Sequence, residues 1–507
     1  MRKLFIKYAI LSVVLLLVGC GKESEYAKVV PVDAELVATF DCERIMKESG
    51  LFAEHASDTQ KQFLETFQKN LSVGETELLE RIFSNPQEAG IDWSKKIYAF
   101  VQSQTHIAAF VIPVSDAERL KASILAFWGP SIKGRKFIDD DLCSWAVSRQ
   151  FQIAVTNEVC MVVTSGGAEK SQTIKELVTE WLSQPEEQSF ISTDYNELLL
   201  DLDGEIGLYA SMSSLPENMS IMASMAYSED MDVNSVKYLA DVSFKKGEVV
   251  AKGKILFEDS DLHEWVKNQG EVFKKLDGNS LAYLPQNTPF WFGVGLNGND
   301  LFDRLLEHPT YGKQLQNMSL PLDIEGVIRS IDGDLSIAYP TGLFVDVKND
   351  EILRICVGAV KTMGRFIGLD LQELAKDQYE LVDENHTLSR ILQKESKLQV
   401  GMKDDSFYLL TSAESTKEMS KEESLVAVPW ADQVEDNLLF MAFNFRYGSE
   451  LVDKYSHNRR KSKVLADYFN YISYSQTDIE KNTIILSFTD QERNVLEQLL
   501  ELYILKL

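Results

Sequence analysis

The chain has 507 residues, of which 45% are hydrophobic, so it can bury large cores and should form more than one domain. It carries 78 acidic and 51 basic residues, which gives a formal net charge of −27. A surface this negative repels nucleic acid and anionic headgroups. The composition therefore excludes a nucleic-acid partner and favours a neutral or cationic one.

The first segment has the layout of a secretory signal peptide. Arg2, Lys3 and Lys7 precede an apolar run over residues 9–18, which only Ser12 interrupts. A bilayer span needs about twenty apolar residues, so this run is too short to cross a membrane as a helix. We therefore expect residues 1–19 to be a signal peptide.

The residues that end this segment resemble a known processing signal. Leu17-Val18-Gly19-Cys20 is similar to the lipobox of bacterial lipoproteins. The resemblance implies cleavage before Cys20, a diacylglyceryl thioether on its sulfur and a third acyl chain on its freed amine. Each methylene group of an acyl chain contributes about 0.8 kcal/mol to the free energy of membrane binding, so several acyl chains would hold the protein on the membrane. Residues 20–28 then form a short lipidated tether; the alternative is an ordinary signal peptide followed by a chance cysteine.

The other cysteines are Cys42, Cys143, Cys160 and Cys356, and no two of them form a Cys-x-x-Cys pair. Their spacing excludes a local zinc site and a thioredoxin-type motif. An exported protein can form disulfides, but the spacing selects no pair. Cys160 and Cys356 lie in apolar runs, where buried free thiols are the expected state.

Short matches recur in the same order in both halves of the chain. Residues 152–165 match residues 399–412, and both segments have the pattern of two short strands around an acidic turn. Ile255–Asp259 resembles Leu486–Asp490, and each segment precedes a helical pattern. Recurrence in a constant order predicts a tandem duplication.

The predicted copies are residues 29–277 and 278–507, joined at the turn-rich stretch Leu276–Ser280. Hairpins, such as the one predicted around Gly247, alternate with helices, which predicts an α+β fold. We expect an antiparallel sheet in each copy, with helices packed on one face. A doubly wound parallel sheet would need a regular alternation of single strands and helices, and that alternation is missing.

The last helix has one apolar face at helical spacing, formed by Val495, Leu496, Leu499, Leu500 and Tyr503. Thr489 stands three residues before Glu492, which is the spacing of a capping box. This pattern predicts a helix that begins next to Thr489.

One segment imitates a dinucleotide-binding fingerprint. Gly293–Gly298 fits Gly-x-Gly-x-x-Gly between an expected strand and an expected helix. The matching positions of the other copy are Thr39, Asp41 and Arg44, so the same turn forms there without glycine. We therefore interpret the segment as a glycine-rich turn and predict no cofactor.

Residue spacing indicates no metal site. His263-Glu264 begins like a zincin helix, but Lys267 stands where the second histidine ligand belongs. Three acidic clusters lack the ligand spacing of a calcium loop. They are Asp139-Asp140-Asp141, Asp201-Leu202-Asp203-Gly204 and Asp332-Gly333-Asp334.

The sequence contains no Gly-x-Ser-x-Gly elbow, which disfavours an α/β-hydrolase, and we assign no catalytic residue. The sequence thus favours a non-catalytic protein that binds an envelope protein or glycan, or has a structural role. A concave seam where the copies meet is the expected recognition surface. The alternative is a hydrolase of envelope or dietary polymers that uses two carboxylates distant in sequence.

The signal peptide, the opening Val29–Ala34 and the duplicated body together resemble an uncharacterised family. That family comprises large lipoproteins of Gram-negative gut bacteria and is known only as a domain of unknown function. Lys22, Glu23 and Glu25 resemble a surface-export signal, interrupted by Ser24, and Gly21 is not the aspartate that retains lipoproteins in the inner membrane. The resemblance implies an outer-membrane lipoprotein, either periplasmic or surface-exposed, and implies no activity.

Overall fold

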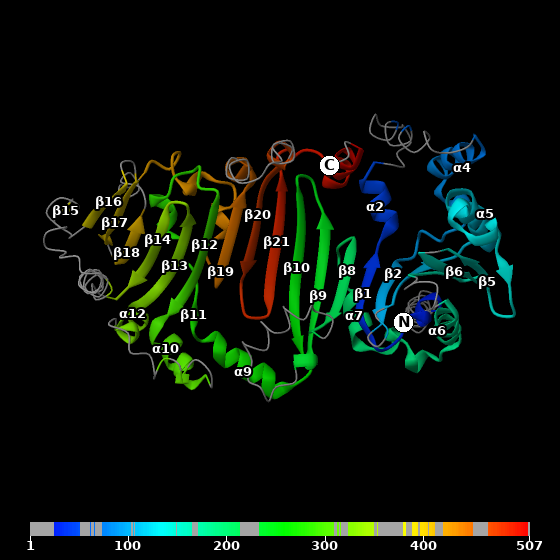
Figure 1. The fold of residues 1–507 in the computed structure, drawn as a ribbon, viewed down its shortest axis with the longest axis horizontal. Helices are drawn as coiled ribbons and strands as arrows, with labels where there is room; N and C mark the ends of the chain where they lie inside the picture. Colours follow the sequence, from blue (N-terminus) through cyan, green and yellow to red (C-terminus); the bar gives the residue numbers. More distant parts are fainter. Residues whose placement is uncertain are drawn as a thin grey trace, which may run out of the picture. The chain divides into compact units, whose positions relative to one another are not determined.

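The computed structural model is shown in Figure 1. It describes residues 25–504 apart from gaps at 51–60, 62–64, 66–72, 103–104, 106, 149, 165–170, 213–232, 309–311, 314, 316–322, 349–351, 353–378, 382–387, 394–395, 404, 411–418 and 450–464. Cys20, Cys356, Thr411 and Ser412 therefore lie outside the described residues. No helix in the described part of the chain is long and apolar enough to cross a membrane.

The chain forms two compact units. The first comprises residues 1–215, 241–243 and 496–506, and the second comprises 216–240, 244–495 and 507. Strand β10 (Glu248–Phe257) belongs to the second unit because it pairs with β21 (Lys481–Phe488) along Glu248–Lys254. The compact units therefore divide the chain at positions other than the predicted junction.

The first unit is an antiparallel sheet with helices. Its strands are β1 (Ala34–Phe40), β2 (Ile97–Gln102), β3 (Ala108–Pro113), β4 (Ile138–Asp139), β5 (Ser144–Val147), β6 (Phe151–Val155), β7 (Val159–Thr164) and β8 (Ile206–Ser211). Their order across the sheet is β8-β1-β2-β3-β7-β6-β5-β4. Its helical segments include η1 (Tyr26–Val29), α2 (Cys42–Glu48), α4 (Val73–Ser84), α5 (Ala117–Trp128), α6 (Ser171–Ser183) and α7 (Asp194–Leu200).

Helices cover both faces of this sheet, which corrects the prediction of helices on one face. Helix α5 packs Leu120 and Ile124 against Ile153 of β6. On the opposite face, the Trp181 ring of α6 lies 5.1 Å from that of Phe100 in β2. Figure 1 shows α5 and α6 on opposite sides of β5 and β6. Both faces are apolar because strands such as β6 bury consecutive residues rather than alternate ones.

The second unit has a longer antiparallel sheet. Its further strands are β9 (Val236–Phe244), β11 (Phe273–Lys274), β12 (Phe290–Asn297), β13 (Ile331–Tyr339), β14 (Gly342–Val347), β15 (Tyr379–Leu381), β16 (Leu388–Gln393), β17 (Ser396–Lys403), β18 (Ser406–Leu410), β19 (Leu439–Asn444) and β20 (Phe469–Gln476). Their order is β9-β10-β21-β20-β19-β12-β13-β14-β18-β17-β16-β15, and β11 also pairs with β12.

Short helices cover one face of this second sheet and α-helices the other. The main core lies under the 3-10 helices η10 (Asn279–Tyr283), η12 (Leu425–Ala427) and η13 (Ala431–Gln433). At its centre Trp291 of β12 and Phe440 of β19 pack with Trp430, and all three are at most 1% exposed. On the other face, α10 (Gly298–Glu307) and α12 (Ile324–Ser330) pack over Val294 and Leu296.

The order of strands is the same in parts of both sheets. The run β8-β1-β2-β3-β7-β6-β5-β4 has its parallel in β19-β12-β13-β14-β18-β17-β16-β15. An isolated bridge joins Pro31 to Ser189 in the first unit, and another joins Pro285 to Ser424 in the second.

The glycines of the dinucleotide-like segment are needed for close packing in the second unit. A Cβ at Gly293 would collide with the Trp291 ring, and one at Gly295 with the carbonyl of Lys274. A Cβ at Gly298 would collide with the carbonyl of Ile328. The segment therefore joins β12 to α10 in an antiparallel sheet, where glycine permits the approach of neighbouring atoms.

The predicted capping box at Thr489 is wrong. Helix α17 (Val495–Ile504) begins several residues later, and the Thr489 hydroxyl donates to the carbonyl of Asp467 at 2.8 Å. Asp490 instead accepts from the backbone N–H of Glu492 at 3.0 Å. The box does not form because Thr489 extends the end of β21, where its N–H also pairs with Tyr468.

Candidate functional site

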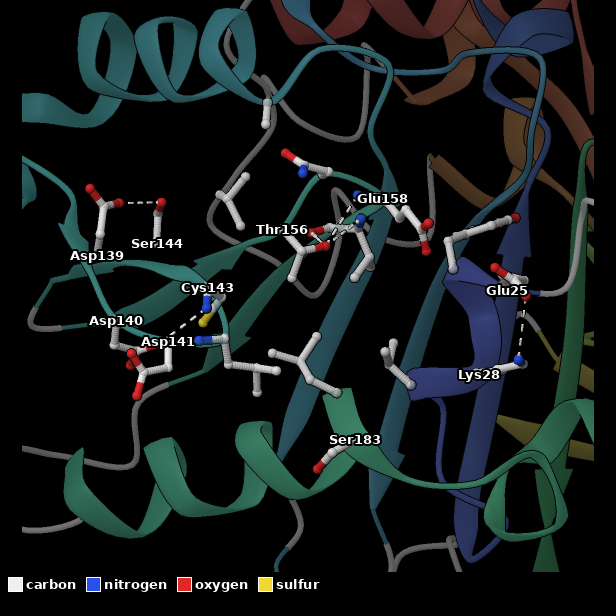
Figure 2. Close-up of a pocket in the computed structure, with 18 of the residues that line it drawn as sticks. Glu25, Lys28, Asp139, Asp140, Asp141, Cys143, Ser144, Thr156, Glu158 and Ser183 are labelled. Atoms are coloured by element: carbon white, nitrogen blue, oxygen red, sulfur yellow. Dashed lines mark hydrogen bonds and ion pairs between the residues drawn. The ribbon is translucent and has the colours of Figure 1, made fainter.

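A polar pocket of about 710 Å³ lies within the first unit. Its walls come from the start of η1, the first turn of α5, the β4–β5 turn, the β6–β7 turn and the end of α6. Figure 2 shows Glu25 and Lys28 on one side of it and Asp139, Asp140 and Asp141 on the other.

Asp140 organises the β4–β5 wall of the pocket. Its carboxylate accepts from the backbone N–H groups of Leu142 and Cys143, both at 3.0 Å. It also accepts from the Trp145 indole at 2.7 Å and lies 2.8 Å from the Lys175 ammonium of α6. Lys175 and these hydrogen bonds hold the pKa of the Asp140 carboxyl well below its usual range. Asp140 thus stays ionised and fixes the turn from which Asp139 and Asp141 line the pocket.

A chain of polar contacts crosses from this wall to α5. The Ser144 hydroxyl donates to Asp139 at 2.5 Å, and the Lys121 ammonium donates to the Ser144 oxygen at 3.4 Å. Lys121 also pairs with Glu118 at 2.5 Å. A serine nucleophile needs a neutral base such as histidine or an unprotonated amine, and no histidine lines this pocket. The contacts with Asp139 and Lys121 hold the Ser144 hydroxyl in place at this wall of the pocket.

The β6–β7 turn supplies the third wall. The Thr156 hydroxyl accepts from the N–H groups of Glu158 and Val159 at 3.2 and 3.0 Å, which closes the turn. Among the described residues, the carboxylates of Glu158 and Asp141 have no hydrogen-bond or ion-pair partner. Both carboxylates are therefore available to a ligand.

Negative charge dominates the lining. Its acidic side chains are those of Glu25, Glu118, Asp139, Asp140, Asp141 and Glu158. Lys28 and Lys121 line the pocket as well, and each lies beside an acid of its own helix turn, Lys28 at 3.7 Å from Glu25. With Lys175 on Asp140, three of the acids are neutralised, so a bound cation would meet a net negative surface.

The pocket also contains a thiol, but it is not a nucleophile at neutral pH. Burial raises the pKa of Cys143 to about 12, and the thiolate is the reactive form. Cys160 is fully buried and unpaired, as expected, and burial raises its pKa to about 12. Cys42 is also free, and burial raises its pKa to about 11.

The three acidic clusters singled out in the sequence have different surroundings. Asp139–Asp141 line the pocket. In the second cluster, the backbone carbonyl of Asp203 accepts from Arg44 at 2.5 Å, and the N–H of Gly204 donates to Asp241 at 2.6 Å. The third cluster lies in the second unit, and His263 there pairs with Glu480 at 2.5 Å. No group of three or more potential ligands in the described residues could hold a metal ion.

Asp334 of the third cluster is a structural group. It is 3% exposed, and its carboxyl oxygens accept from the N–H groups of Asp277 and Gly278 at 3.1 and 2.7 Å. It thereby fixes the turn at the predicted junction. Burial, with the charges of Asp346 and Asp277, raises the pKa of Asp334 to about 6.

This buried carboxyl predicts a pH effect on stability. The folded pKa exceeds the usual value of 3.8, so the folded state binds the proton more tightly, and the stability contributed is lost as pH rises from about 4 through 6. Asp334→Asn removes that dependence. We expect the free energy of unfolding of the variant, relative to that of the wild type, to increase by about 3 kcal/mol between pH 4 and pH 7. Urea unfolding at both pH values measures the difference.

The exposed Asp432→Asn change in the same unit is the control, because it removes one carboxyl group without touching the turn at Asp277 and Gly278. An Asp334→Asn difference that stays constant would show that folding does not raise the pKa of Asp334.

The sequence did not indicate Glu158 or Lys175 as site residues. Glu158 was visible only as part of an acidic turn, and Lys175 approaches Asp140 only because α6 packs beside β5. Long-range contacts of this kind leave no local spacing in the sequence.

The family described as "Domain of unknown function (DUF4836)" matches residues 26–496. Two solved structures are similar to the chain, entitled "Structure of crystal form I of TP0453" and "Structure of crystal form IV of TP0453". The first is 7% identical with a TM-score of 0.26, and the match covers 49% of this chain and 86% of that one. The second is 8% identical with a TM-score of 0.26, covering 45% and 79%. Both similarities are too low to carry over fold or function, and no curated protein matches the sequence.

Proposed function

The chain belongs to this family of unknown function, and we propose that it is a membrane-anchored envelope lipoprotein. We propose that it binds a cationic partner without catalysis. The pocket of the first unit is the proposed binding site. The observation that carries the proposal is the pair of available carboxylates, Asp141 and Glu158, in a net-negative cavity.

The anchoring part of the proposal rests on Leu17–Cys20 and the short apolar run before it. Lipidation of Cys20 would place the protein on the outer membrane, facing the periplasm or the cell surface. Gram-negative gut bacteria are the proposed source, because the signal peptide, the opening Val29–Ala34 and the duplicated body resemble a family of lipoproteins from these bacteria.

The binding part rests on the chemistry of the pocket. Its volume falls within the range of about 300–1,000 Å³ that is common for ligand sites. Ammonium or guanidinium groups would form charge-assisted hydrogen bonds with Asp141 and Glu158. The partner is thus a basic segment of an envelope protein; a glycan bearing amino groups shares this chemistry.

A hydrolase of envelope or dietary polymers finds less support. Its general acid would need a carboxyl with a raised pKa. In the described residues, the carboxyls whose pKa burial raises are Asp334 and Asp346, which belong to the second unit and lie outside this pocket. Both accept hydrogen bonds from neighbouring protein groups, so neither is free for a substrate.

The binding proposal predicts a salt-sensitive interaction with a tetralysine peptide. Residues 21–507, purified without the anchor, should bind this probe and not tetraglutamate, and binding should weaken as salt rises. Asp141→Asn with Glu158→Gln should weaken it at least tenfold, because each charge-assisted bond contributes about 1.5–3 kcal/mol. Isothermal titration calorimetry measures both.

The matched control removes the same charge elsewhere, with Asp432→Asn and Glu435→Gln on the exposed surface of the second unit. Equal weakening by both double variants would assign the binding to overall charge and reject the pocket. Turnover of a polymer substrate, lost on changing one pocket carboxylate, would favour the hydrolase.

We also propose that the chain is a tandem duplication of segments 29–277 and 278–507. The shared strand order and the matching bridges Pro31–Ser189 and Pro285–Ser424 support it. Further support comes from the β10–β21 ladder, where Lys252 faces Thr483. These two are counterparts when Ile255 is matched to Leu486, and a strand that pairs with its own counterpart is expected at a local two-fold axis.

A further inference from the structure

The described residues begin at Glu25, five positions after the proposed lipid anchor at Cys20. Tyr26 is 4% exposed, its hydroxyl donates to the carbonyl of Lys96 at 2.6 Å, and its ring lies 6.0 Å from that of Tyr98. Val29 and Val30 are buried as well. Residues 26–30 are therefore held firmly against the first sheet and add no length to the tether.

The same segment forms a wall of the pocket. Glu25, Tyr26, Lys28 and Val29 all line it, and Figure 2 shows Glu25 and Lys28 at its edge. An extended chain spans at most about 3.6 Å per residue, so the five steps from Cys20 to Glu25 reach about 18 Å. A lipidated Cys20 would confine this wall of the pocket to that distance from the membrane surface.

We propose that the pocket works at the membrane surface, and that its ligand is a basic segment of another membrane protein displayed close to the bilayer. This inference rests on the proposed lipidation of Cys20 and on the proposed cationic ligand. It specifies that the ligand lies at the membrane surface and that a second membrane protein carries it.

Charge and tether length together select this partner. The pocket keeps Asp141 and Glu158 unneutralised, which suits a segment with more than one positive charge better than a zwitterionic headgroup. A short tether also raises the effective concentration of any partner fixed to the same membrane, and it gives no such advantage to a soluble cation.

The experiment uses the full lipidated protein on phosphatidylcholine vesicles. The probe is a tetralysine peptide, either soluble or anchored to the same vesicles by two acyl chains. A variant carries thirty Gly/Ser residues between Gly21 and Lys22, which extends the tether to an r.m.s. length of about 30 Å. We expect the variant to bind the anchored peptide about tenfold more weakly than the wild type, and the soluble peptide equally well.

The control adds the same thirty residues after Leu507 and should change neither affinity. An inserted tether that leaves both affinities unchanged, or weakens both equally, would overturn the membrane-surface inference while leaving the pocket as a cation site. A wild type that fails to bind the soluble peptide would instead reject the proposed function, and this inference with it. Competition by phosphatidylethanolamine vesicles would identify a lipid headgroup as the ligand and reject the basic segment.

Discussion

Replacing Cys20 with alanine is expected to release the protein from the membrane fraction almost completely. The proposed anchor consists of acyl chains on this one residue, and the described residues contain no helix that could cross the bilayer in its place. One acyl chain gives only marginal binding and several give stable binding, so loss of the acylated residue removes the whole effect. Fractionation of cells, followed by immunoblotting, measures the distribution.

Ser24→Ala, four residues further along the tether, is the matched control and should stay in the membrane fraction. Labelling with a fatty-acid analogue should disappear in the Cys20→Ala variant and persist in the control. Unchanged labelling of the Cys20→Ala protein would show that the resemblance to a lipobox is accidental.

Trp291→Ala is expected to cause the largest loss of stability in the second unit, about 3–5 kcal/mol. Trp291 is fully buried, and its ring packs on those of Trp430 and Phe440 at centroid distances of 6.1 Å. The ring also occupies the space that the missing side chain of Gly293 leaves open, so its removal creates a cavity that neighbouring side chains cannot fill. Urea unfolding followed by circular dichroism measures the loss.

Trp291→Phe separates packing from hydrogen bonding. Among the described residues the Trp291 indole N–H has no hydrogen-bond partner, and a buried unpaired donor costs about 1–3 kcal/mol. Phenylalanine keeps much of the ring and removes this donor, so we expect it to lose far less stability than alanine does. Equal losses for both substitutions would mean that the indole N–H is bonded in solution, for example to water.

The sequence predicted features that depend on local residue order. The hairpin around Gly247 forms as predicted, since β9 and β10 flank a glycine at φ +69° that suits the turn. The mixed α+β character with antiparallel sheets is also confirmed. Both follow from short patterns of apolar and turn-forming residues, which a single segment contains in full.

Features that depend on distant partners could not be predicted in this way. Helix α17 begins later than predicted because the Thr489 hydroxyl bonds to the carbonyl of Asp467. Helices cover both faces of the first sheet because β6 buries consecutive residues. The same holds for the pocket: the sequence singled out Asp139–Asp141 as a cluster, but only the fold brings Glu158 and Glu25 to the same cavity. The expectation of a recognition seam where the copies meet stays a prediction.

The raised pKa values of the three free thiols also affect how an exported chain would react with oxidants. With their pKa values at about 11 to 12, Cys42, Cys143 and Cys160 would each be thiolate in no more than about one molecule in 10⁴ at pH 7. Thiol–disulfide exchange proceeds through the thiolate, so these three cysteines react slowly with oxidants once the chain has folded. Once the first unit has folded, burial therefore protects these three thiols against disulfide exchange in an oxidising compartment.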